Sequence, residues 1–254
     1  MSIDVSIYSP AIRPFLWQDL IASLAGKNQV SFEIIFVGHV PPEFQLPDNC
    51  RHINSAVKPV QCAEIGFRQC WGEFCLFISD DMIFQEGCLD RLIAAHRSIG
   101  SHHIAVSCMH MAGKKVIPLT HCRFMPGRLD SPMLPMAAIY KTEVYRSLGP
   151  RDRNFVCTYA DLDLAMRFYE IGGEVIYLED VVVEEIIIPG TTIDMYDTGL
   201  NWLGKDIDWP LVCDLWMEND QFLKNRKRPV EPFVEEGLLT ESQGPKGHPA
   251  RQWV

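Results

Sequence analysis

The 254-residue sequence has no apolar stretch near the roughly 18–20 residues that a membrane-spanning helix needs. No basic segment followed by an apolar one stands at its N-terminus, so we expect no signal peptide and a cytoplasmic protein. Internal repeats and low-complexity tracts are also absent. With 47% hydrophobic and 22% charged residues, the chain is expected to bury one large core, or one core with a trailing extension.

Cysteine pairs of the CxxC type are missing, although the chain has nine cysteines. Their number is odd, their spacing is scattered, and several lie within apolar runs, where cysteine behaves as a small buried hydrophobic residue. We therefore expect reduced thiols rather than a disulfide framework or a zinc site.

Basic residues are in the minority: 23 Lys and Arg stand against 33 Asp and Glu, for a formal net charge of −10. This balance argues against a general surface for nucleic acids or other polyanions. One basic strip, KNRKRP at 224–229, is expected to be a solvated segment.

Strand and helix patterns alternate along the first ~110 residues. Short apolar runs predict strands, and apolar residues at helical spacing predict helices between them. The predicted strands are 4–10, 32–38, 74–79 and 103–109, and the predicted helices are 15–26, 59–72 and 87–100. This alternation is typical of a parallel α/β sheet built from right-handed crossovers.

The second half of the sequence is less regular. Residues 111–135 hold several Pro and Gly and are expected to be a loop-rich insert. An amphipathic helix is predicted at 158–173, and a strand follows it. The segment 201–217 contains Trp and is expected to fold back on the core, whereas 228–254 has the composition of an extended tail.

Several polar residues stand where predicted strands end. In open parallel sheets the ligand binds at the carboxyl ends of the strands, so these ends are expected to converge on one crevice. The residues concerned are Ser9, Pro10, Gly38, His39, Asp80 and Asp81.

The adjacent pair Asp80 and Asp81 follows a buried strand directly. Two like charges so close repel each other, so a positive group is expected beside them. From the residues alone three interpretations remain open: a turn that binds local N–H groups, a site for Mg²⁺ or Mn²⁺, and acid–base catalysis by paired carboxylates.

Two ordered sequence blocks resemble the glycosyltransferases of family two, which have the GT-A fold. The first, "VSIYSPAIR … LIASLAG … FEIIFVGHVPP … QCAEIGFRQCWGEFCLFISDD", is similar to the family's "VSIIIPTYN … EIIVVDDGS … ARNIGLKxAKGEYILFLDADD". The second, "MAAIYKTEVYRSLGPRDRNFVCTYADLDLAMRFYEIGGEVIYLEDVVVEE", resembles the family's block around "yEDvDLclRl". Together they cover roughly residues 3–185.

The resemblance implies an α/β fold with three layers, α/β/α, around a mostly parallel sheet. It implies a GT-A domain at 1–190, with a donor half at about 1–110, an acceptor half at about 111–190, and an extension at 191–254. The implied activity is metal-dependent, inverting transfer of a sugar from a nucleotide-diphospho donor to a hydroxyl acceptor, a glycan ahead of a modified DNA base. Mn²⁺ or Mg²⁺ is the implied cofactor.

Residue by residue, the resemblance places Asp81 on the last acid of the family's DxD, as a metal ligand. Asp80 lies at the middle position, and Ser79 replaces the first acid. Glu184 stands where the family has a His near the metal, and is therefore a second candidate metal ligand. Asp161 falls on the Asp of the family's "ED", the base that takes the acceptor's proton.

Asp161 also has a purely structural interpretation. Thr158 stands three residues earlier, so "TYAD" reads as a capping box in which Asp161 binds the helix N-terminus. That position is expected to lower the pKa of Asp161, because a helix N-terminus favours negative charge.

The donor site departs from the family pattern. The family's "DDGS", whose acid reads the nucleotide, falls on Val37, Gly38 and His39, so His39 or backbone groups are expected to take over. "SPAIR" replaces "PTYN", which leaves Arg13 as a phosphate partner or as a surface charge. Ser9 and Pro10 belong to the same candidate donor site.

Two other functions remain open at this point. The departures from the family motifs are compatible with a non-catalytic relative that binds a nucleotide or sugar. A nucleotidyltransferase is a further option, although the sequence lacks a Gly-rich basic phosphate loop. We expect the segment 120–140 to contact the acceptor, and four tryptophans to pack in the core: Trp71, Trp202, Trp209 and Trp216.

Overall fold

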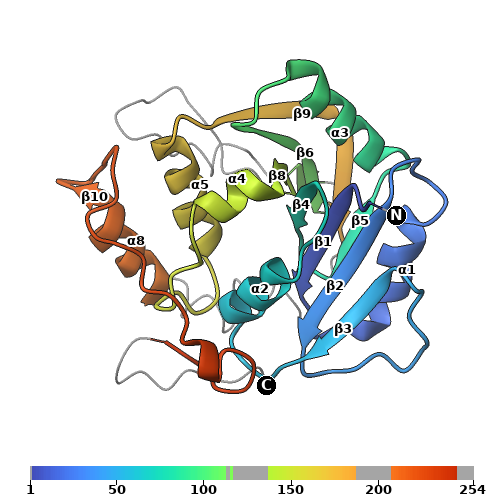
Figure 1. The fold of residues 1–254 in the computed structure, drawn as a ribbon, viewed down its shortest axis with the longest axis horizontal. Helices are drawn as coiled ribbons and strands as arrows, with labels where there is room; N and C mark the ends of the chain where they lie inside the picture. The colour runs from blue at the N-terminus through green and yellow to red at the C-terminus, as the bar shows by residue number, and fades with distance from the viewer. Residues whose placement is uncertain (1, 113–114, 117–136, 187–206, 245–254) are drawn as a thin grey trace.

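The structure is a computed structural model that describes residues 2–112, 115–116, 137–186 and 207–244. Four parallel strands form one half of its sheet, in the order β3-β2-β1-β4 (Figure 1). They are β1 (Val5–Pro10), β2 (Phe32–Gly38), β3 (Cys50–Asn54) and β4 (Phe74–Phe77). The predicted parallel arrangement is confirmed, but β3 was not predicted because its sequence CRHIN has no apolar run.

The second half of the sheet mixes directions. Strand β8 runs antiparallel between β4 and β6, β9 lies parallel to β6, and β5 and β7 pair antiparallel with β9 and β6. The strands are β5 (Met82–Phe84), β6 (Ile104–Ala112), β7 (Lys115–Val116), β8 (Ile139–Lys141) and β9 (Glu174–Glu185). Both sequence blocks therefore contribute to a single sheet.

Helices cover both faces of this sheet, which confirms the predicted three layers (Figure 1). One face packs against α1 (Pro14–Leu24) and α3 (Cys88–Ile99). The other packs against α2 (Pro59–Arg68), α4 (Thr142–Ser147), α5 (Ala160–Glu170) and α8 (Trp209–Trp216). No helix in the described ranges is both long enough and apolar enough to cross a membrane.

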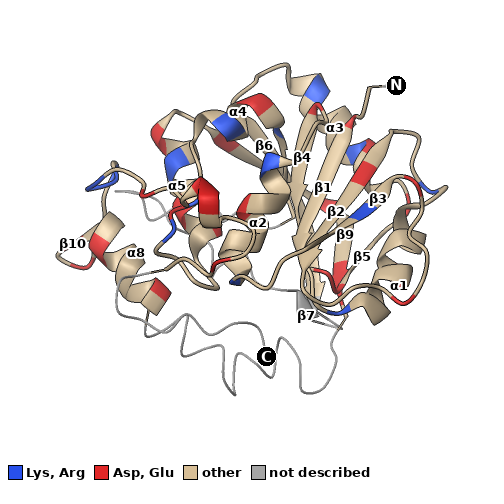
Figure 2. Cartoon of the chain, turned by 60° about the horizontal axis from the view of Figure 1, so that its bottom comes forward, with Lys and Arg blue, Asp and Glu red and all other residues tan. Residues whose placement is uncertain are grey.

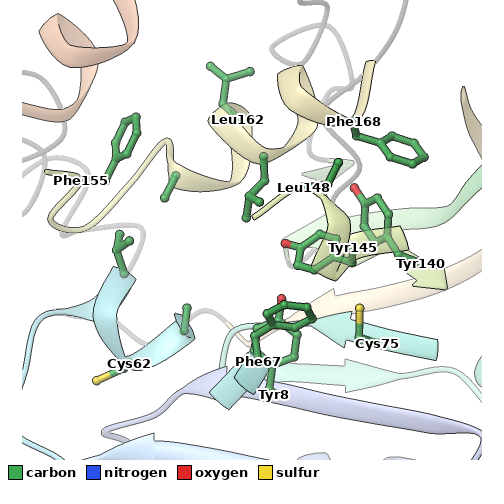
Figure 3. Packing of buried hydrophobic residues seen from close by; sticks show 14 of the residues in the cluster. Tyr8, Cys62, Phe67, Cys75, Tyr140, Tyr145, Leu148, Phe155, Leu162 and Phe168 are labelled. Carbon is green, nitrogen blue, oxygen red and sulfur yellow. The ribbon is translucent and has the colours of Figure 1, made fainter. Parts of the chain in front are cut away.

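Aromatic side chains fill the core beneath α2, α4 and α5 (Figure 3). Tyr8 of β1 lies 5.7 Å from Phe67 of α2, measured between ring centroids, and Phe67 lies 4.8 Å from Tyr145 of α4. Tyr140 of β8 meets Phe168 of α5 edge to face at 5.2 Å. Each ring pair lies at a favourable aromatic separation, and the contact between Phe67 and Tyr145 joins the two sequence blocks.

Residues 207–244 pack onto the same face. Trp216 is fully buried, and its indole N–H donates to Asp163 over 2.9 Å. Arg226 pairs with Asp163 at 2.8 Å and with Asp152 at 2.6 Å. The expectation that KNRKRP is a solvated segment is therefore wrong at Arg226, whose side chain is buried. The predicted end of the GT-A domain at residue 190 stays a prediction.

Lys58, which directly precedes α2, is fully buried, and we expect it to make stability depend on pH. Burial lowers its pKa to about 7, against the nearby charges of Asp208 and Asp152. Between this value and the ordinary 10.5, the unfolded chain holds a proton that the folded chain lacks. The free energy of unfolding therefore rises with pH in this window, by up to about 1.4 kcal/mol per pH unit.

Urea unfolding of the wild type and of Lys58→Met, at several values between about pH 7 and 9, measures this effect. The variant lacks the titrating amine and is expected to show a flatter dependence. Below the folded pKa both states hold the proton, so the difference between the two proteins should become constant. Parallel pH profiles across the window would contradict the prediction.

Candidate active site

The ends of β1 and β2 meet at one edge of the sheet. The backbone N–H of Ala11 donates to Val37 O over 2.8 Å, just after β1 ends at Pro10. A Cβ at Gly38 would stand 1.8 Å from Ala11 O, so only glycine permits this approach. Ser9 is buried and donates to Pro10 O over 2.9 Å.

Gly38→Ala is expected to push the loop after β1 away from β2. Such overpacking costs about 1–3 kcal/mol of unfolding free energy. The loop carries Arg13, so the affinity for a nucleotide bound at this edge should fall as well. Thermal unfolding and titration of the variant with nucleoside diphosphates check both effects, and unchanged values would contradict the close contact.

Asp80 is saturated with donors, most of them from the start of α1. Its carboxylate accepts from the backbone N–H groups of Ile12 at 2.9 Å and Arg13 at 2.8 Å. It also accepts from the guanidinium of Arg13, through Nε at 2.8 Å, and from the indole of Trp17 at 3.3 Å. Asp80 therefore holds the loop between β1 and α1 in place.

Asp81 is likewise enclosed. Its carboxylate lies 2.6 Å from Nη1 of Arg13 and also accepts from the hydroxyl of Ser79. Burial lowers the pKa of Arg13, but the charges of Asp80 and Asp81 outweigh it and raise the pKa overall. Arg13 is thus the positive group that the adjacent carboxylates require.

This arrangement does not fit a divalent metal ion. A metal needs accessible carboxylate oxygens, but Asp80 is 1% exposed and Asp81 is 0% exposed, and both are bound to Arg13. Among the described residues, no group of three or more His, Cys, Asp or Glu side chains has the arrangement of a metal site. The placement of Asp81 and Glu184 as metal ligands stays a prediction.

Glu184 reaches this edge through the backbone of β9. Glu184 pairs with Ile83 of β5. Just beyond the end of β9, the N–H of Ile186 donates to Asp81 O over 2.8 Å. The side chain of Glu184 is exposed. Its neighbour Glu185, which sequence analysis did not single out, lies 3.1 Å from Nε2 of the buried His110.

A cavity of about 90 Å³ is lined by both Ser79, which directly precedes the acid pair, and Asp161. Ser79 stands two residues beyond the end of β4, and most of the cavity surface is apolar. The lining residues are Phe77, Ile78, Ser79, Met82, Ala137, Ala138, Tyr140, Tyr145 and Asp161. The cavity thus brings together the strand end and the acid that the two sequence blocks predicted separately.

Asp161 is the carboxylate of this cavity. It stands in the first turn of α5, which begins at Ala160, and accepts from the N–H of Leu162 over 2.9 Å. Burial raises its pKa, against that hydrogen bond and the charge of Arg151. The expectation that the helix N-terminus lowers the pKa of Asp161 is wrong, because the loss of solvent around the carboxylate has the larger effect on its pKa.

The predicted capping box is also wrong. No side chain caps α5, and the residue before it, Tyr159, has a left-handed backbone with φ of 58°. The N–H groups of the preceding loop bind Asp208 instead, at 2.8 Å from Val156 and 2.7 Å from Thr158. Asp208 lies far along the chain, so no local motif could have identified it.

Arg151 is a charged residue near the cavity that sequence analysis missed. Its buried guanidinium donates to the hydroxyls of Tyr8 at 2.8 Å and Tyr145 at 3.3 Å. It lies 5.4 Å from the ring centroid of Phe77, within cation–π range. Nothing in the local sequence "GPRDR" signals this role, because every partner comes from another element.

The remaining candidates have mixed outcomes. His39, beside Gly38, is half-buried, and its Nδ1 has no hydrogen-bond partner within the part of the chain that is described. Trp216 packs in the core as predicted. Trp209 is partly buried against the same core, and its ring centroid lies 5.4 Å from that of Tyr159. Trp71 is 76% exposed, so its predicted packing is wrong. Trp202 and most of the segment 120–140 lie outside the described residues.

No protein-family model and no curated protein matches the chain. Solved structures of S. aureus TarS, a GT-A-type glycosyltransferase, do match it. TarS 1–349 superposes with a TM-score of 0.54 and 18% identity, over 72% of this chain and 60% of that chain. For the complex of TarS 1–349 with UDP, the TM-score is 0.55 and the sequence identity is 16%, over 77% of this chain and 63% of that chain. For the complex with UDP-GlcNAc, the TM-score is 0.51 and the sequence identity is 17%, over 76% of this chain and 61% of that chain.

The chain thus spans about three-fifths of the length of TarS 1–349. At these identities the likeness concerns the fold. As the family-two resemblance predicted, the chain has the GT-A fold.

Proposed function

We propose that the protein transfers a sugar from a UDP-sugar to a hydroxyl group of an acceptor. The observation that carries this proposal is the cavity lined by both Ser79, beside the acid pair, and the half-buried Asp161. TarS, which shares the fold, has been solved with UDP and with UDP-GlcNAc, which supports a UDP-linked donor.

In the proposed reaction, the acceptor hydroxyl attacks the anomeric carbon of the donor while Asp161 takes its proton. The new C–O bond forms as the bond to the β-phosphate breaks, and its electron pair leaves with UDP. Attack opposite the leaving group inverts the anomeric configuration. A carboxylate with a raised pKa suits this role, because it binds the proton more readily than an ordinary aspartate does.

Metal dependence stays a prediction from the family resemblance. The described oxygens of Asp80 and Asp81 are bound to Arg13 and to N–H groups, so no step of the proposed reaction is routed through a metal.

A glycan is the proposed acceptor. Acidic and basic positions are interspersed over the elements seen in Figure 2, and the net charge is −10. A DNA acceptor would favour a basic face, because contacts to phosphates dominate the affinity.

Incubation with UDP-sugars and a panel of glycan acceptors tests the proposal by the release of UDP. UDP release that depends on the acceptor is the expected result. In a parallel incubation with UTP and a sugar 1-phosphate, release of pyrophosphate would favour a nucleotidyltransferase. Binding of UDP without turnover on any acceptor would favour a non-catalytic relative.

A further inference from the structure

Arg13 occupies the position at which the family resemblance expects a divalent ion. Its guanidinium reaches both carboxylates at once, with Nη1 2.6 Å from Asp81 and Nε 2.8 Å from Asp80. Its own backbone N–H also binds Asp80, so side chain and main chain of one residue share the same acid. A metal ion would have to displace a guanidinium that is bound to the two acids through Nε, Nη1 and Nη2.

Every carboxylate oxygen of Asp80 and Asp81 already accepts a hydrogen bond from within the protein. The start of α1 directs the N–H groups of Ile12 and Arg13 at Asp80, and the Trp17 indole adds a third donor. These dipoles stabilise part of the Asp80 charge, which leaves the guanidinium to balance Asp81. A second cation has no uncompensated carboxylate to bind among these groups.

We propose that Arg13 takes the place of the divalent ion, and that the donor's diphosphate binds at this edge without metal. This inference rests on the proposed function. A guanidinium stays charged at every working pH, and its planar fork matches phosphate oxygens. The Arg13 side chain is 13% exposed, whereas the acids behind it are closed to solvent.

Two titrations of the full chain test this inference. Calorimetry measures UDP affinity with EDTA and with Mn²⁺. Electron paramagnetic resonance measures the concentration of free Mn²⁺ in the absence of nucleotide. The loss of free Mn²⁺ then reports binding by Asp80 and Asp81 without a contribution from the diphosphate. We expect UDP affinity to agree within about threefold in the two buffers, and the wild type to bind no stoichiometric Mn²⁺.

Arg13→Met should weaken UDP binding at least about tenfold in EDTA. Arg13→Met leaves the carboxylate of Asp81 without its charged partner. If that variant does not fold, the double variant Arg13→Met with Asp81→Asn, which also removes this charge, is used in its place. Arg97→Met is the matched control, because Arg97 also bridges two acids, Asp4 and Glu73, near the opposite ends of β1 and β4. It should leave UDP affinity unchanged.

A requirement for Mn²⁺ in UDP binding would overturn the inference while leaving the proposed function standing. Stoichiometric Mn²⁺ that is lost in Asp81→Asn would overturn it as well, and so would undiminished UDP binding by Arg13→Met. Absence of UDP binding in both buffers would instead reject the UDP donor, and the inference with it.

Discussion

Asp161→Asn is expected to lower kcat by about 10²–10⁴-fold, the usual contribution of a general base. The amide keeps the shape of the side chain but cannot take the acceptor's proton. UDP affinity should change little, because Asp161 lines the cavity, whereas Arg13, Asp80 and Asp81 are not among its lining residues. Initial rates with saturating donor, beside UDP calorimetry, separate the two effects.

The wild-type pH profile supplies a second readout of the same role. The base works only when ionised, so activity should fall as the pH drops through its pKa. Burial raises that pKa, so the fall should begin at a higher pH than for an ordinary aspartate. Asp214→Asn, at an exposed acid of α8 paired with Arg228, is the control and should keep full activity. A variant at Asp161 with near wild-type kcat would reject the assignment.

Asp163→Ala is expected to reduce the free energy of unfolding by about 3–5 kcal/mol, because it leaves buried positive charge without its partner. Asp163 lies 2.8 Å from Nε of Arg226 and 2.9 Å from Nη2 of Arg167. It also accepts from the indole of Trp216. The substitution should therefore loosen residues 207–244 from α5, which urea unfolding and amide hydrogen exchange measure.

An exposed acid provides the matched control for this effect. Asp214→Ala breaks the pair with Arg228, both of which are largely exposed, and should cost at most about 1 kcal/mol. Equal losses for the two variants would show that burial does not set the energy of the Asp163 cluster.

Much of the fold follows from local patterns. Apolar runs identified β1, β2, β4 and β6, and helical spacing identified α1, α2 and α3, because each pattern reports burial of neighbouring residues. Gly100 ends α3 as predicted, with the left-handed φ of 72° that glycine tolerates. Short elements were missed: β5 and β8 have three residues each, too few for a period to show.

The sequence by itself also determined which acids stand at strand ends and helix starts, namely Asp80, Asp81 and Asp161, since position along an element is a local property. Only the tertiary structure decided what those acids do. Arg13 reaches Asp80 across 67 residues, and Asp208 binds the Thr158 loop across 50. Such pairings depend on strand order and on how helices pack over the sheet. Burial, which raises the pKa of Asp161 and closes off Asp81, is likewise a consequence of that packing.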